Sequence, residues 1–200
     1  MAILKAGNME VEIRFHKYQS CGCIEYSFEP RVQDMPLINP LVNKGYCKDG
    51  KYICYSVWHE ESLIPFFERL LKEKQNANWD QWPEDDITIK AETWQSRREQ
   101  KKKDWEGKTV LVTDFDGELK REPYEETMKM FEPFFEAFFD MNIIFNRRFF
   151  AGETDPWESC DVCLKFTLSF DRLERCVEEM KAEYEIFKLT RMDEWENYKY

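Results

Sequence analysis

Two aspartates, Asp114 and Asp116, form the most suggestive chemical pattern in the chain. They follow the apolar run VLVT and stand immediately before Gly117, so a β-strand would end at a tight turn that carries two carboxylates. Carboxylates in such a place can act as a nucleophile or as an acid and base.

The stretch 110–119, with its Asp-Phe-Asp-Gly core, resembles the first motif of haloacid-dehalogenase-type phosphatases. The resemblance implies a metal-dependent phosphate hydrolase with Asp114 as the nucleophile and Asp116 as the acid and base. It also implies a later Lys or Arg, a second acidic pair and several strand–helix units, but only 83 residues follow Gly117 and no such acidic pair ends a later apolar strand. Residues 109–122 equally fit a β-hairpin with Asp116 and Gly117 as its two-residue turn. We predict the hairpin, with the hydrolase as the alternative.

Two close cysteine pairs could supply four thiolates to a structural zinc ion: Cys21 with Cys23, and Cys160 with Cys163. The first pair lacks the two-residue spacer of a zinc knuckle, and Cys163 falls within an alternating strand pattern. A zinc-binding module is therefore a second alternative. The chain also has no glycine-rich phosphate loop and no nucleophile elbow. We predict a protein that is not an enzyme and that binds no cofactor or metal.

Residues 75–86 are predicted to form a polar loop, and its acidic and aromatic segment, 78–86, is the predicted partner-binding site. Tryptophan is frequent among the residues that dominate binding at interfaces, and a rim of carboxylates attracts a basic partner. The alternative is that both tryptophans pack into the core. The predicted binding residues are Trp79, Asp80, Trp82, Glu84, Asp85 and Asp86.

The charge balance narrows the class of partner. The chain carries 40 acidic and 29 basic side chains, a net charge of −11. Such a surface repels nucleic acid and anionic membranes and favours a basic protein. The basic run at 97–103 lies among acidic residues and indicates a solvated helix face.

No apolar run approaches the roughly 20 residues of a membrane span, and the first residues do not form a signal peptide. We expect a cytoplasmic protein with reduced cysteines, acting as a stoichiometric, immunity-like inhibitor.

The hydrophobic periodicity predicts a single α+β domain over residues 1–200, with a mainly antiparallel sheet built from hairpins and about three amphipathic helices. Strands are expected at 9–15, 23–29, 87–91, 142–150 and 162–170, with further hairpins around Asp49-Gly50 and Asp116-Gly117. Amphipathic helices are expected at 62–74, at 123–141 with a kink or break at Pro133, and at 172–188 with Asp171 as N-cap; a charged, exposed helix is expected at 94–106.

Two segments share the pattern Pro-Phe-Phe-Glu followed by apolar residues: IPFFERLL at 64–71 and EPFFEAFF at 132–139. Each follows an Asp-Gly pair at nearly the same distance. These matches indicate a diverged internal duplication around 45–74 and 109–141. In a chain rich in phenylalanine, however, the match can also arise by chance.

Overall fold

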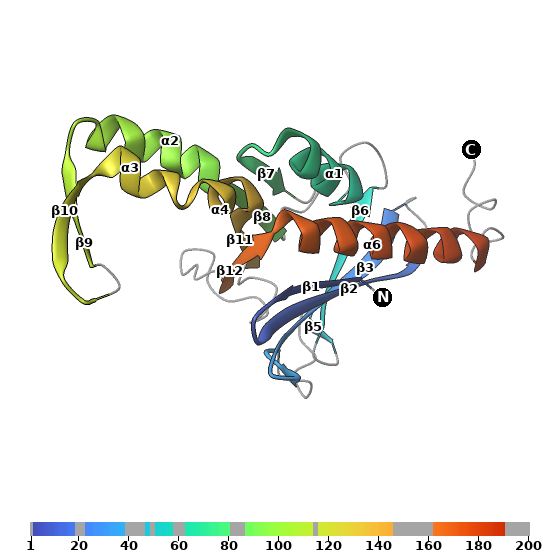
Figure 1. The fold of residues 1–200 in the computed structure, drawn as a ribbon. Helices are drawn as coiled ribbons and strands as arrows, with labels where there is room; N and C mark the ends of the chain where they lie inside the picture. The colour runs from blue at the N-terminus through green and yellow to red at the C-terminus, as the bar shows by residue number, and fades with distance from the viewer. Residues whose placement is uncertain are drawn as a thin grey trace, which may run out of the picture.

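The chain folds as an α+β protein whose sheets are antiparallel, as the sequence predicts (Figure 1). The computed structural model describes residues 2–18, 23–38, 47–48, 51–57, 63–80, 87–113, 116–145 and 162–190. Within these ranges the strands form a six-stranded, a four-stranded and a two-stranded sheet. The two larger sheets and two helices enclose the main hydrophobic core.

The six-stranded sheet has the order β1-β2-β3-β6-β5, with β4 beside β3. The predicted hairpin of β2 with β3 is confirmed, and its inward side chains alternate with polar ones. Lys48 of β5 pairs with Lys51 of β6, and the predicted Asp49-Gly50 turn between them lies outside the described residues. The strands are β1 (Ala2–Ala6), β2 (Met9–Tyr18), β3 (Cys23–Val32), β4 (Met35–Pro36), β5 (Cys47–Lys48) and β6 (Lys51–Val57).

Strand β1 was not predicted, although a turn signal follows it. Ala6 pairs with Met9, so Gly7 and Asn8 form a two-residue turn. The φ of Gly7 is +59°, which is a conformation that glycine adopts without steric cost. Gly-Asn between two apolar runs is a recognised hairpin signal, but the first run is too short to display clear alternation.

The four-stranded sheet has the order β12-β11-β8-β7, and each neighbouring pair is antiparallel. The predicted loop at 75–86 is wrong over residues 77–80, which form the edge strand β7. The predicted strand at 142–150 begins earlier, at Phe138. The strands are β7 (Ala77–Asp80), β8 (Ile87–Thr93), β11 (Phe138–Phe145) and β12 (Val162–Ser169).

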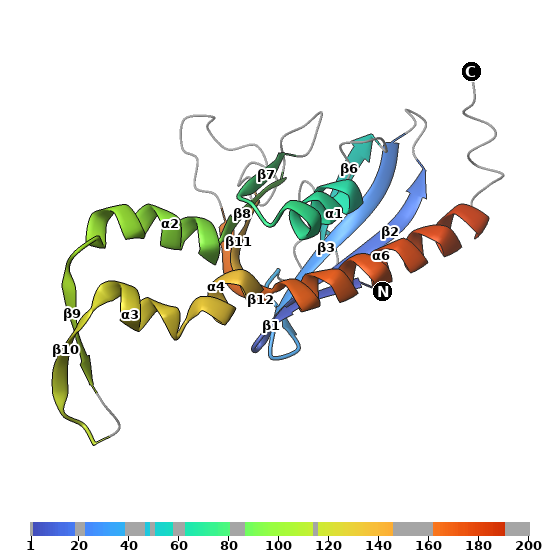
Figure 2. The ribbon, with the colours of Figure 1, turned by 45° about the horizontal axis from the view of Figure 1, so that its top comes forward.

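Two helices confirm the predicted amphipathic pattern: α1 (Leu63–Glu73) and α6 (Phe170–Thr190). They pack against each other, and α6 also lies along β1 and β2 (Figure 2). The predicted N-cap of α6 is wrong by two residues. The helix begins at Phe170, and the hydroxyl of Ser169 accepts a hydrogen bond from the amide of Arg172 at 3.4 Å, so Asp171 lies inside the first turn.

The predicted helix at 123–141 is two short helices followed by a strand. α3 (Tyr124–Lys129) ends before α4 (Glu132–Ala137), and Pro133 lies in the first turn of α4, where a missing amide costs nothing. The expected break is confirmed, but the chain from Phe138 onward is β11. Its alternating buried residues pair with β8 on one side and β12 on the other.

Residues 94–137 form an arm that leaves the four-stranded sheet after β8 and returns to it at β11 (Figures 1 and 2). The arm contains the predicted exposed helix, α2 (Trp94–Trp105), then the hairpin β9 (Thr109–Thr113) and β10 (Leu119–Pro123), then α3 and α4. The hairpin lies at the far end, away from α1 and α6. The strand–helix units of the proposed duplication thus lie in different sheets, and the duplication stays a prediction.

Candidate functional site

Asp140 anchors the base of the arm to the four-stranded sheet. Its carboxylate accepts hydrogen bonds from the hydroxyl of Thr167 at 2.6 Å and from the indole Nε1 of Trp94 at 3.1 Å. It also pairs with the guanidinium of Arg97 at 2.6 Å. Burial raises the pKa of Asp140, but the hydrogen bonds from Thr167, Trp94 and Arg97 outweigh that effect and the net pKa is lowered. The charged form therefore joins α2 to β11 and β12.

The two halves of the arm are held together by paired side chains. Arg98 of α2 forms an ion pair with Glu132 of α4 at 2.7 Å, and its guanidinium lies 5.3 Å from the ring centroid of Phe135. Near the far end, Trp105 stacks on Tyr124 with 5.7 Å between ring centroids. These contacts order the arm without giving it a hydrophobic core of its own, because α2 has no buried residue.

The arm exposes most of the large apolar side chains that the described surface presents. Among the described residues nine such side chains are exposed, and six of them lie on the arm. An exposed apolar patch on a folded protein is commonly a binding surface. The six are Trp105, Leu111, Leu119, Met130, Phe131 and Phe134.

These side chains fall into two main groups. Leu119 pairs with Thr113, and Leu111 lies two residues before Thr113, so both leucines project from the same face of the hairpin. Met130, Phe131 and Phe134 lie at the junction of α3 and α4, with the exposed carboxylates Glu125, Glu126 and Glu136 on the same two helices. We call this second group of six residues the α3–α4 surface. It combines apolar side chains with negative charge.

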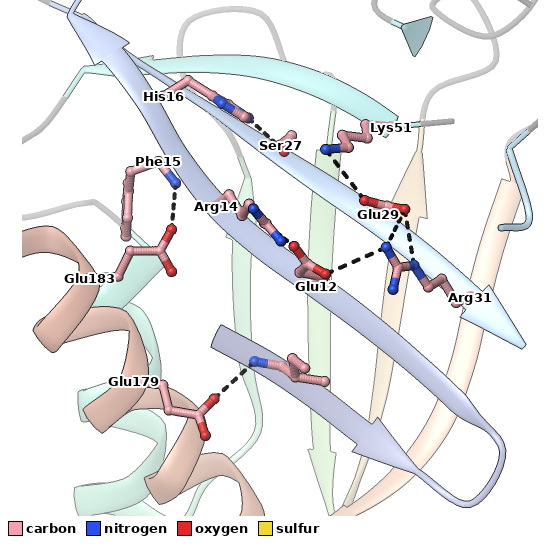
Figure 3. Close-up of polar contacts among 11 residues, drawn as sticks. Glu12, Arg14, Phe15, His16, Ser27, Glu29, Arg31, Lys51, Glu179 and Glu183 are labelled. Carbon is pink, nitrogen blue, oxygen red and sulfur yellow. Dashed lines mark hydrogen bonds and ion pairs between the residues drawn. The ribbon is translucent and has the colours of Figure 1, made fainter. Parts of the chain in front are cut away.

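Figure 3 shows a different polar cluster, on the outward face of β2, β3 and β6. Glu12 pairs with Arg14 and, at 3.7 Å, with Arg31; Glu29 pairs with Arg31 at 2.6 Å and with Lys51 at 3.6 Å. Each buried carboxylate thus has two cationic neighbours. Such compensated pairs satisfy buried charge and join adjacent strands.

A histidine and a serine lie beside this cluster. The ring of His16, at a β-bulge in β2, is 2.8 Å from the hydroxyl of Ser27 (Figure 3). Burial lowers the pKa of His16, although Glu25 opposes the shift. A neutral histidine beside a serine is the pairing used in nucleophilic catalysis. Ser27 is only 1% exposed, however, so a substrate cannot reach its hydroxyl in this arrangement. We interpret the pair as structural.

Of the six predicted binding residues in the segment 78–86, the structure describes two, and their side chains have different environments. Trp79 is 5% exposed and packs against Phe66 with 6.5 Å between ring centroids, so its side chain belongs to the core. Asp80 is exposed and accepts a hydrogen bond from Thr88 at 2.6 Å. Trp82, Glu84, Asp85 and Asp86 lie outside the described residues.

The aspartate pair lies in the loop of the arm hairpin. Thr113 pairs with Leu119, so the connection has five residues, and the predicted two-residue turn is wrong although the hairpin itself is confirmed. Asp116 is exposed and Gly117 has a φ of +82°, whereas Asp114 lies outside the described residues. The strand before the pair belongs to a two-stranded antiparallel sheet. A phosphatase of the type that the motif resembles would place it among strand–helix units.

The predicted zinc ligands are mostly outside the described residues. Cys21 and Cys160 are not described, nor is the side chain of Cys23, while Cys163 is an exposed free thiol on β12. Among the described side chains, no three His, Cys, Asp or Glu residues gather closely enough to hold a metal ion. The zinc alternative stays a prediction.

The sequence reasoning missed the arm because its elements were predicted separately and nothing local indicates where they go. Only the pairing of β8 with β11 shows that residues 94–137 are an insertion between adjacent strands. Two signals were present: α2 lacks an apolar stripe, and in β9 Leu111 lies between Val110 and Val112, so that this strand carries apolar side chains on both faces. Comparison with protein-family models, curated proteins and solved structures found no match to this chain.

Proposed function

We propose that this protein is a non-enzymatic binding protein that captures a partner protein with its arm. One observation carries the proposal: the exposed large apolar side chains of the described surface are concentrated on an element that projects from the core. An arm with so little buried surface gains stability when a partner covers it. A stoichiometric inhibitor of the immunity kind works by such capture.

The chemistry of the α3–α4 surface favours a basic partner. Phe131 and Phe134 offer aromatic anchors, and exposed carboxylates lie on the same two helices. Aromatic anchors contribute affinity once water is expelled, whereas the carboxylates attract cationic side chains before contact. The net charge of −11 acts in the same direction at longer range.

A protein partner accounts for the arm better than nucleic acid does. Two of the five cations of the basic run are engaged within the protein, Arg97 by Asp140 and Arg98 by Glu132. The three remaining lysines lie on one helix of an acidic chain. No helix within the described ranges is long and apolar enough to cross a membrane. We place the protein in the cytoplasm, a location supported by the free thiols of Cys163 and Cys176.

Affinity purification from the native cells tests the proposal. The bait proteins are the unaltered chain, an arm variant with Phe131→Ser and Phe134→Ser, and a body variant with Met35→Ser and Leu37→Ser, which removes two exposed apolar side chains outside the arm. We expect a basic protein to co-purify stoichiometrically with the unaltered chain and the body variant, and to be lost from the arm variant. A partner retained equally by all three baits would contradict the proposal.

The acidic segment predicted from the sequence is a second contact surface in this proposal. Once a partner is identified, replacing Glu84, Asp85 and Asp86 by Lys should slow its association and flatten the dependence on salt, because long-range attraction is screened over roughly 8–10 Å at physiological salt. Glu125→Lys with Glu126→Lys gives the same measurement for the α3–α4 surface. The pair of results identifies which surface steers the encounter.

A further inference from the structure

Strand β9, at the far end of the arm, has an edge that no other strand of the described chain covers. The sheet of the arm hairpin contains only β10 and β9, so each strand is paired on one side alone. Figure 1 shows this hairpin at the end of the arm, away from α1 and α6. An open edge presents backbone N–H and C=O groups to any strand that comes beside it.

The hydrogen bonds of the hairpin determine which backbone groups of β9 point outward. The amide of Tyr124 donates to the carbonyl of Lys108 at 3.0 Å. Along an antiparallel ladder the direction of these groups alternates from one residue to the next. The second and fourth residues of β9 therefore bond to β10, whereas Thr109, Leu111 and Thr113 direct their N–H and C=O groups to the open edge.

The two edges of the hairpin differ in their protection against pairing. β10 has the sequence Leu-Lys-Arg-Glu-Pro, and Pro123 has no backbone N–H to offer at the outer edge. Charged side chains and proline on an edge strand discourage pairing with another chain. β9 has the sequence Thr-Val-Leu-Val-Thr, which contains neither and consists mostly of residues that are frequent in strands. The edge of β9 can therefore accept a further strand, whereas the edge of β10 resists one.

The sequence of β9 is a palindrome centred on Leu111. When two antiparallel copies align at this residue, leucine lies opposite leucine, valine opposite valine and threonine opposite threonine. The three residues of each copy that point outward then all form hydrogen-bonded pairs, and the β-branched side chains contact their equivalents. An interface with two-fold symmetry requires a surface that is complementary to itself. The edge of β9 meets this requirement.

The charge around β9 allows a second copy of this acidic chain to approach. Residues 107–123 carry three basic and four acidic side chains, a net charge of −1, against −11 for the whole chain. In the aligned pair the charged strand β10 of one copy lies three strand spacings, roughly 14 Å, from β10 of the other. That separation exceeds the screening distance of roughly 8–10 Å at physiological salt. Repulsion between the copies is therefore weakest at this end of the arm.

We propose that β9 pairs with β9 of a second copy of this chain, so that two arms share one antiparallel sheet in the order β10-β9-β9-β10. Leu111, which is 64% exposed in the single chain, lies at the two-fold axis and contacts its equivalent. One strand edge is a small interface, so we expect a dimer with a Kd in the roughly micromolar range. The α3–α4 surface contains no residue of β9 or β10, so the inference is separate from the capture of a partner.

Sedimentation equilibrium of the full chain from roughly 1 to 200 μM tests for the dimer. We expect the mean mass to rise with concentration toward twice the chain mass of 24.4 kDa. A mean mass that stays at one chain over the whole range overturns the proposal.

Hydrogen exchange at both ends of this concentration range identifies the edge. The amides of Thr109, Leu111 and Thr113 should be protected only at high concentration, whereas those of Val110 and Val112 should be protected at both, because they bond to β10. A dimer that adds no protection at the three outward amides overturns the assignment to β9.

Two proline substitutions compare the edges. Leu111→Pro removes a donor from the outer edge of β9, and Arg121→Pro removes one from the outer edge of β10 at the paired position. Leu111→Pro should weaken the dimer at least about tenfold, whereas Arg121→Pro should dimerise like the unaltered chain. Protection of the Val110 and Val112 amides shows that the hairpin is kept. A Leu111→Pro variant that keeps this protection and still dimerises overturns the proposal.

Two charge variants test the register without removing any backbone donor. Thr109→Lys with Thr113→Lys places lysine opposite lysine at both ends of the paired strands and should weaken the dimer at least about tenfold. Thr109→Lys with Thr113→Glu places opposite charges across from each other in the antiparallel register and should dimerise at least as tightly as the unaltered chain. Both threonines are exposed in the single chain, so the hairpin tolerates the changes. Equal affinity of the two double variants overturns the register centred on Leu111.

Discussion

The guanidinium of Arg97 lies 2.6 Å from the carboxylate of Asp140, and this pair joins the first turn of α2 to the strand on which the arm returns. The Asp140 side chain is 8% exposed. The orientation of the arm therefore depends on a buried charge near its base, while the surfaces proposed for binding lie farther along it.

Asp140→Asn should destabilise the protein by about 2 kcal/mol at neutral pH, because hydrogen bonds to a charged group are worth about 1.5–3 kcal/mol and three partners lose that charge. Urea unfolding measures the change. Asp104→Asn, an exposed change on α2, should stay within about 0.5 kcal/mol. Equal effects for the two variants would show that the Asp140 charge does not hold the arm.

The same pair predicts a dependence on pH. The pKa of Asp140 is lowered below its ordinary value of 3.8. The carboxylate therefore contributes its full stabilisation above that ordinary value, and the contribution is lost as the pH falls through the lowered, folded-state pKa. The difference in unfolding free energy between the unaltered chain and Asp140→Asn should be constant from neutral pH to about pH 5. It should shrink below about pH 4, and a difference that persists in strong acid would contradict this account.

Trp79→Ala should destabilise the free protein by about 3–5 kcal/mol, as expected for removing a buried aromatic side chain. Trp79 packs against Phe66 within the core. Trp105→Ala removes a tryptophan that is 40% exposed and should cost less. Thermal unfolding compares the two. If Trp79→Ala melts like the unaltered protein and instead loses a partner, Trp79 is an interface anchor rather than a core residue.

Gly117→Val should destabilise the arm hairpin by about 1–2 kcal/mol, because a β-branched residue is strained at positive φ. The φ of Gly117 is +82°, and no atom lies close enough to obstruct a new Cβ, so the strain arises in the backbone alone. Gly117→Asn should cost less, since asparagine tolerates this region. Hydrogen exchange of the amides of β9 and β10 measures the effect locally. Equal protection in both variants would argue against a constrained turn.

Hydrolysis of a generic aryl phosphate with magnesium tests the alternative raised by the aspartate motif. We expect no turnover above buffer, because the hairpin loop exposes Asp116 at the end of the arm. Asp114→Asn and Asp116→Asn should therefore change nothing. Reproducible activity that either substitution abolishes would restore the hydrolase.

The sequence by itself determined most of the individual elements. Helix α1, with its stripe of Leu63, Phe66, Phe67 and Leu70, and the alternating strand β12 follow from hydrophobic periodicity alone. The break at Pro133 follows from the missing amide of proline. These features are local, because the residues that cause each one lie within a few positions of one another.

Tertiary structure decided the features that depend on distant partners. Residues 138–141 continue an apolar helical pattern, yet they form a strand because β8 and β12 satisfy their backbone groups on both sides. Trp79 is a core residue because β7 pairs with β8 and brings its side chain against α1. The arm exists only because β8 and β11 pair across residues 94–137. Local propensity contains no information about such pairing, which follows instead from burying the apolar faces of both sheets in one core.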